Sequence, residues 1–115
     1  MLHIVMAMLA SSPKIWAKIP RLIQRGIISG LIGDKQAQGD PKIFWTVDDN
    51  GWVYEARITT PSRAVYHGYP LLPGDAMAIK VISRFSRWTL GDGELQNNDS
   101  LAREALRAAQ ERYRR

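Results

Sequence analysis

Between Ile43 and Tyr69, hydrophobic residues recur at every second position, a period that predicts β-strands. Asn50-Gly51 lies inside this stretch, and this dipeptide favours a two-residue type I′ turn because both central residues need positive φ. The pattern therefore predicts a β-hairpin centred on this dipeptide. A two-residue loop would place three pairs opposite one another: Asp49 and Trp52, Thr46 and Glu55, and Phe44 and Arg57.

A third strand is expected over 63–69, after the turn residues Thr60-Pro61-Ser62. The length of the preceding loop decides which side chains share a face with Arg57. A loop with an even number of residues would place Tyr66 beside Arg57 and turn His67 towards the core. We expect the odd loop, Pro61-Ser62-Arg63, because burying a tyrosine costs less than burying a histidine. It pairs Arg57 with His67 and Ile58 with Tyr66.

Helical periodicity appears on both sides of these strands. The N-terminal segment, 1–33, carries apolar residues at helical spacing after Ser12-Pro13, with Pro20 expected to kink or split the helix. Asp75 is the expected N-cap of a helix over 75–88, and a last helix is expected over 99–114. Helix, strands and then helices predict a single α+β domain over 1–115. Its antiparallel three-stranded meander spans 42–69, with helices on one face and no parallel pairing.

Composition narrows the classes of partner. The 115 residues are 45% hydrophobic, enough for one core, and the absence of cysteine excludes disulfides and thiolate zinc sites. The formal charge of +5 favours anionic partners such as nucleic acid, phosphate ligands or an acidic membrane surface. No cofactor motif appears, and His3 and His67 are too few and too separated to predict a metal site. We expect neither a signal peptide nor a membrane span, and therefore a cytoplasmic protein.

Glu55, Arg57 and His67 form one candidate catalytic group, because the odd loop gathers them on one face of the sheet. Glu55 would accept the proton of an RNA 2′-hydroxyl, and His67 would protonate the leaving 5′-oxygen. Arg57 would hold the phosphate and stabilise its developing charge. These residue types and the helix-first layout resemble small microbial ribonucleases and ribonuclease toxins of the barnase type over about half the chain. That resemblance implies RNA cleavage without a metal.

Two basic stripes on helices form a second candidate site. Basic residues on one helical face can neutralise successive phosphates, and neighbouring aromatic side chains can stack on bases. Strands followed by a helix also resemble AP2-type and integrase arm-type DNA-binding domains, which read DNA with the sheet. The expected contacts are Arg57, Arg63, Lys80, Arg84 and Arg87. The first helix adds a separate stripe of Lys14, Lys18, Arg21 and Arg25.

Binding of RNA or DNA through the phosphate backbone is therefore the first functional hypothesis. The ribonuclease is an alternative, which leaves open whether the protein is an enzyme. A protein-interaction or inhibitor module with an acidic protein partner is another. Residues 12–31 also fit an amphipathic segment for an anionic membrane or a partner's groove. A homodimer is the final alternative, through Phe44 and Val53 if both are exposed.

Overall fold

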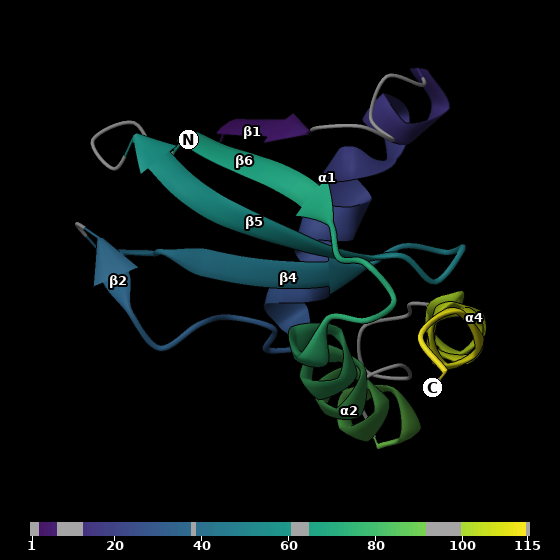
Figure 1. Ribbon diagram of the computed structural model, residues 1–115. Coiled ribbons are helices and arrows are strands. Elements are labelled where there is room, and N and C mark those ends of the chain that lie inside the picture. Colours follow the sequence, from purple (N-terminus) through teal and green to yellow (C-terminus); the bar gives the residue numbers. More distant parts are fainter. Residues whose placement is uncertain (1–2, 7–12, 38, 61–64, 92–99, 115) are drawn as a thin grey trace.

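The computed structural model describes residues 3–6, 13–37, 39–60, 65–91 and 100–114 (Figure 1). Its helices are α1 (Pro13–Ile28), α2 (Ala76–Leu90) and α4 (Ala102–Arg112). Its strands are β1 (His3–Met6), β2 (Gln36–Ala37), β3 (Asp40–Pro41), β4 (Ile43–Val47), β5 (Val53–Thr60) and β6 (Val65–Pro70). The α+β class and the order of the predicted helices and strands are confirmed.

The main sheet has the strand order β1-β6-β5-β4, and β2 pairs only with β3. The antiparallel meander β4-β5-β6 is the one expected from the sequence. The prediction that no strands pair in parallel is wrong, because β1 runs parallel to β6 with His3 opposite Val65. The partner of β1 lies far along the chain, so no local pattern indicates it. The connector between α1 and β4 contains β2 and β3.

The hairpin loop is one residue longer than the Asn-Gly signal predicts. Gly51 N donates to Asp48 O over 3.0 Å, and the Asp48 carboxylate accepts from Asn50 N at 3.0 Å and Trp52 N at 2.8 Å. Gly51 has φ of +85°, as in a type I turn followed by a left-handed residue. The predicted register is therefore wrong by one residue. The observed partners are Thr46 with Tyr54, Trp45 with Glu55, and Ile43 with Arg57.

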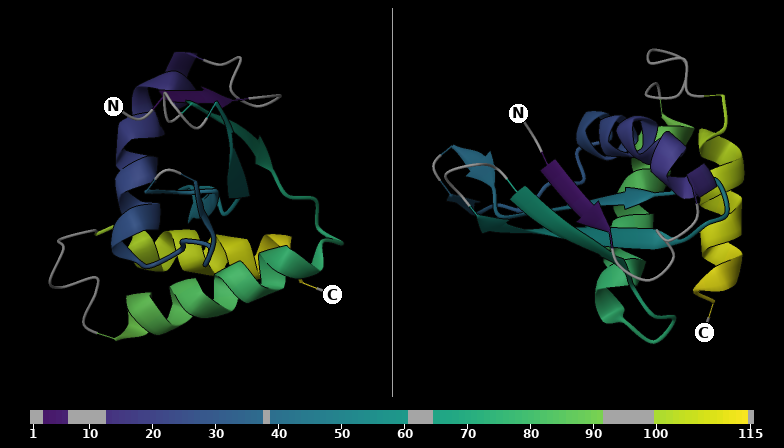
Figure 2. Two further views of the ribbon diagram at one scale, coloured as in Figure 1. Left: turned by 90° about the vertical axis from the view of Figure 1, so that its left-hand side faces the viewer. Right: turned by 90° about the horizontal axis from the view of Figure 1, so that it is seen from above.

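The helices cover both faces of the sheet, not one face as predicted (Figure 2). The α1 side contains Phe44 and Tyr66, whose rings meet edge to face at 5.1 Å. On this side α1 approaches β4 so closely that a Cβ on Gly26 would lie 2.2 Å from Trp45 O. The opposite side carries Val47 and the other residues that pack under α2 and α4. Alternation along a strand turns successive side chains to these two sides.

The predicted helix boundaries agree best at α2. Met77 N donates to the Asp75 carboxylate over 2.8 Å, so the predicted N-cap is confirmed. The last helix begins at Ala102, and Asp99 lies outside the described residues. The first helix continues through Pro20, so it is not split there, and Ser12 also lies outside the described residues.

Phe44 and Val53 belong to the interior. Phe44 is 3% exposed and Val53 is 0% exposed, because each faces a helix-covered side of the sheet. The predicted dimer surface through these two residues is therefore wrong. Separately, the described helices include none with the length and apolar character needed to cross a membrane.

Candidate functional site

One half of a sheet face carries the candidate catalytic residues, and none of the described helices lies over it. The loop end of this face lies under α2 and α4, and the other end projects beyond them (Figure 1). We call the projecting part the open half-sheet, and its residues are Ile43, Glu55, Arg57, His67 and Tyr69. The third-strand register is confirmed, with Arg57 opposite His67 and Ile58 opposite Tyr66. Tyr66 is buried and His67 exposed, as expected.

Glu55 is the most enclosed member of the open half-sheet, at 5% exposure. Trp45 Nε1 donates to its Oε1 over 3.0 Å, and Arg57 Nε donates to its Oε2 over 2.8 Å. The Tyr69 hydroxyl donates to the same Oε2. The three donors come from β4, β5 and β6, and both Trp45 and Tyr69 lie directly opposite Glu55 in the ladder. The hairpin register therefore assembles this network.

Hydrogen bonds keep the Glu55 carboxyl ionised despite its enclosure. Burial alone would raise its pKa. The bonds from Tyr69, Arg57 and Trp45 outweigh burial and lower the pKa below its ordinary value of 4.5. The pKa of the Arg57 guanidinium is raised by its bond to Glu55. Glu55 is consequently a fixed negative charge and a weakened proton acceptor, because a lower pKa means a weaker base.

The Nε of Arg57 is held by hydrogen bonds, while much of the side chain is exposed to solvent. Its Nε donates to Glu55 and also to the Tyr69 hydroxyl over 2.9 Å, while 58% of the side chain is exposed. No bond from its two Nη groups to any described residue is present. A guanidinium fixed in this way is prepared to bind a phosphate with two parallel donors. The entropy of ordering the side chain has already been lost before a ligand arrives.

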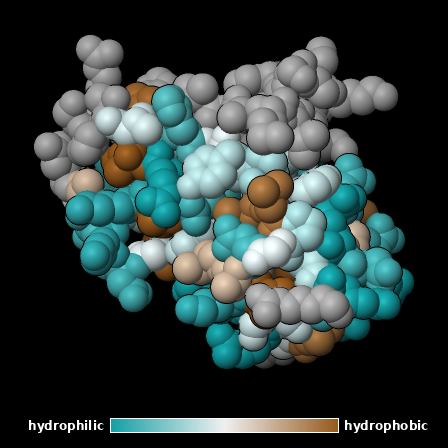
Figure 3. Space-filling view, viewed as in Figure 1, coloured by the Kyte–Doolittle hydropathy of each residue, from teal (hydrophilic) through white to brown (hydrophobic). Residues whose placement is uncertain are grey.

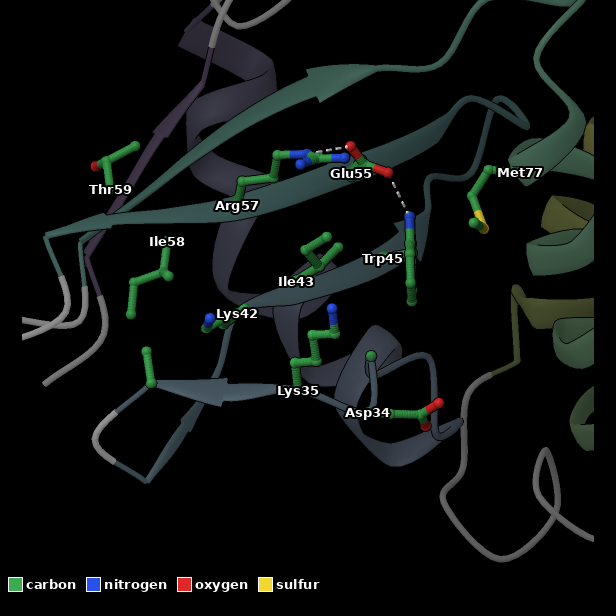
Figure 4. A pocket seen from close by; sticks show the side chains of 12 residues that line it. Asp34, Lys35, Lys42, Ile43, Trp45, Glu55, Arg57, Ile58, Thr59 and Met77 are labelled. Carbon is green, nitrogen blue, oxygen red and sulfur yellow. Dashed lines mark hydrogen bonds and ion pairs between the residues drawn. The ribbon is translucent and has the colours of Figure 1, made fainter.

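A cavity of about 730 Å³ opens beside Arg57, between β4 and β5 on one side and the segment before β2 on the other (Figure 4). Lys35 and Lys42 contribute further positive charge to its lining, and Asp34 contributes a carboxylate. Its apolar lining includes Ile43, Trp45, Ile58 and Met77. Figure 4 shows the side chains of Lys35 and Ile43 facing the same space as Arg57. Charge and apolar surface thus meet in one hollow.

The basic residues of α2 lie on the same helical stripe as Met77. Arg84 Nη2 donates to Gly30 O over 2.7 Å, which fixes the segment leading into the cavity wall. Met77 lines the cavity, and Lys80 lies between Met77 and Arg84 on the same helical stripe. Arg87 continues the stripe and is exposed. Among the described carboxylates, none forms an ion pair with Lys80, Arg84 or Arg87.

The stripe on α1 has a different role from the one expected. Arg25 is only 1% exposed and donates to Val47 O over 2.7 Å and to Asp49 over 2.9 Å. Arg21 also pairs with Asp49. These two arginines therefore anchor the hairpin loop, although the Arg21 side chain is still 41% exposed. The side chains of Lys14 and Lys18, and the whole of Arg63, lie outside the described residues.

No grouping of histidine and acidic side chains able to hold a metal ion occurs within the described ranges. Comparison of the chain with models of known protein families, with curated proteins and with solved structures found no match.

Sequence analysis missed four residues of this site: Trp45, Tyr69, Lys35 and Lys42. Trp45 and Tyr69 follow from the ladder once the loop has its observed length, because both are directly opposite Glu55. Lys35 precedes β2 and Lys42 follows β3. The backbone hydrogen bond from Lys42 N to Lys35 O folds the segment between them towards the sheet. A two-residue strand pair of this kind has no clear periodic signal.

Proposed function

We propose that this protein binds nucleic acid by the phosphate groups of its backbone, at the open half-sheet and the adjoining cavity. Phosphate contacts supply much of the affinity of nucleic-acid-binding proteins, and arginine binds phosphate with two donors at once. The observation that carries the proposal is the fixed conformation of the Arg57 side chain. Glu55 and Tyr69 hold its Nε, and the Arg57 side chain lines a hollow to which Lys35 and Lys42 also contribute.

The test is the salt dependence of binding to a labelled single-stranded oligonucleotide, followed by fluorescence anisotropy. Affinity should fall log-linearly with salt concentration. Arg57→Gln should weaken binding by about tenfold and reduce the slope by about 1. Arg107→Gln is the matched control, because it removes the same charge from an exposed position on α4 at the other end of the sheet. Equal losses in both variants would contradict the proposal.

A second candidate, RNA cleavage without a metal, is favoured by one observation: His67 lies directly across the ladder from Arg57. Glu55 is diagonal to His67, at a Cβ separation of about 7 Å, so the two can flank a phosphate held by Arg57. Glu55 would take the proton of the 2′-hydroxyl, whose oxygen attacks phosphorus. The bond from phosphorus to the 5′-oxygen then breaks, and His67 protonates that oxygen. The lowered pKa of Glu55 makes this candidate secondary to binding.

The cleavage candidate has its own test. RNA incubated with the protein in EDTA should yield 2′,3′-cyclic phosphate ends, and His67→Ala should abolish them while binding persists. A strand with 2′-deoxyribose at the scissile position should bind and stay intact. Intact RNA after prolonged incubation with the folded wild-type protein would exclude this candidate and leave phosphate binding unaffected.

A further inference from the structure

The cavity beside Arg57 is larger and more apolar than a phosphate site needs. Its volume of about 730 Å³ lies within the range of pockets that enclose small organic ligands. A phosphate held at Arg57 would leave most of this space to water, against the apolar side chains of Ile43, Trp45 and Met77. A ligand that joins phosphate to a flat apolar group would fill the space better, because it removes that apolar surface from water.

From this juxtaposition we infer that the cavity receives one unpaired nucleotide of a single strand, with its base in the apolar part and its phosphate at Arg57. This inference rests on the proposed function, and it names the substrate class of that site. Bases that are splayed out of a strand are recognised by stacking and apolar contact in concave sites, whereas paired bases cannot enter them. The ligand is therefore single-stranded nucleic acid, not a continuous duplex.

The walls of the cavity are held in place before a ligand arrives. Trp45 is fixed by its bond to Glu55, and Gly33 N donates to Ile43 O over 2.9 Å. Gly33 and Lys35 on this wall follow the segment that Arg84 anchors. On the face seen in Figure 3, hydrophobic residues lie in small groups between hydrophilic ones. Such a surface suits a ligand with alternating charged and apolar parts better than a wholly apolar partner.

Charge also selects this ligand. Glu55 and Arg57 neutralise each other within the sheet, and the remaining charges at the cavity are Lys35 and Lys42 against Asp34. The surplus is positive, and Lys80 on the neighbouring stripe of α2 adds to it. These lysines lie where the phosphates on either side of a bound nucleotide would pass. An acidic ligand without a flat apolar group would use the cations and leave the apolar wall uncovered.

The test compares a DNA single strand with an abasic strand of the same length and charge, both labelled and measured by anisotropy at one salt concentration. Deoxyribose strands exclude cleavage as a complication. The base-bearing strand should bind about tenfold more tightly than the abasic strand, since stacking of one base supplies this order of advantage. Met77→Trp should fill the cavity and remove the advantage of the base-bearing strand. Ile79→Trp, at an α2 position that is 40% exposed, is the matched control and should keep the advantage.

Each outcome has a defined meaning. Equal binding of both strands by the wild-type protein would overturn the nucleotide pocket and leave phosphate binding standing. A tenfold advantage that survives in a folded Met77→Trp variant would place the base elsewhere and also overturn it. Absence of binding to either strand would overturn the proposed function itself. The wild-type comparison needs no variant, so misfolding of Met77→Trp, detected by thermal unfolding, cannot hide the answer.

Discussion

At the scale of single residues, Glu55 acts on this site mainly through Arg57. The carboxylate accepts from Trp45, Arg57 and Tyr69, and all three bonds favour its ionised form. A buried carboxylate with a lowered pKa is better suited to orienting a cation than to taking a proton. The Nη groups of Arg57 form no hydrogen bond with the described residues, which leaves them available to the proposed phosphate ligand. The Glu55 pKa is therefore a direct measure of how well the site is organised.

Tyr69→Phe should raise the pKa of Glu55 relative to the wild-type protein, because the hydrogen bond from the Tyr69 hydroxyl, which stabilises the ionised carboxylate, is lost. A ¹³C NMR titration of the Glu55 carboxyl measures this change. The folded-state pKa lies below 4.5, so the stability from ionised Glu55 is complete above about that pH and is lost as pH falls through the folded pKa. Tyr69→Phe should therefore lose less stability on acidification than the wild type.

The control for this prediction is Tyr66→Phe. Tyr66 lies on the opposite side of the sheet and its hydroxyl donates to Pro41 O, so the same deletion leaves the Glu55 network intact. An unchanged Glu55 titration in Tyr69→Phe, or an equal shift in both variants, would show that the Tyr69 hydroxyl does not stabilise the carboxylate.

At the scale of elements, the close contact between α1 and β4 supports one wall of the site. Trp45 lines the cavity with its side chain, while its carbonyl oxygen faces Gly26 of α1. Only a residue without a Cβ fits at that distance. Arg25 completes the contact by bonding Val47 O, so the position of β4 depends on α1 along much of its length. A change in α1 should therefore reach the cavity through the backbone of β4.

Gly26→Ala should destabilise the protein by roughly 1–3 kcal/mol, because the new methyl group would overlap Trp45 O and force α1 away from β4. Urea unfolding followed by tryptophan fluorescence measures the loss. Gly74→Ala is the matched control, since no heavy atom lies within 4 Å of a Cβ at Gly74 and its φ is not in the left-handed region. Equal stability of the two variants would mean that the contact is looser than described.

The elements also show how far the sequence alone can predict this molecule. Alternation and capping residues identify β4, β5, β6 and α2, and the cost of burying a histidine predicts the pairing of Arg57 with His67. The hairpin register could not be predicted from the Asn-Gly signal alone, because the Asp48 side chain stabilises a three-residue loop. The pairing of β1 with β6 and the folding of Lys35 towards Arg57 depend on contacts between distant segments, which local patterns do not contain.

At the scale of the whole molecule, the packing of α4 on the hairpin and the proposed binding site lie at opposite ends of the sheet. α2 and α4 gather at the hairpin end, where Arg112 lies 4.1 Å above the Trp52 ring and a Cβ on Gly51 would meet the backbone of α4 (Figure 1). The Tyr113 hydroxyl links the C-terminal end of α4 to this end of the sheet. It accepts a hydrogen bond from Val53 N over 2.9 Å and donates one to Leu71 O over 2.8 Å. At the other end, no helix within the described ranges lies over the charged residues Glu55 and Arg57.

Tyr113→Phe should lower the free energy of unfolding by roughly 1–3 kcal/mol, because it leaves a buried backbone donor and a buried acceptor without their partner. Thermal and urea unfolding measure the loss. Oligonucleotide affinity at a temperature where the variant is folded should match the wild type, since Tyr113 is remote from Arg57. A loss of affinity without a loss of stability would contradict this separation of the two ends.

The most direct test of the central claim is an NMR titration of the ¹⁵N-labelled protein with a single-stranded DNA oligonucleotide. If the strand binds at the proposed site, the Arg57 Nε–Hε resonance should shift together with the backbone amides of 33–35, 42–45 and 55–59, while those of α4 stay in place. Shifts that centre on α4 or the hairpin loop, with the Arg57 resonance unmoved at saturation, would contradict it.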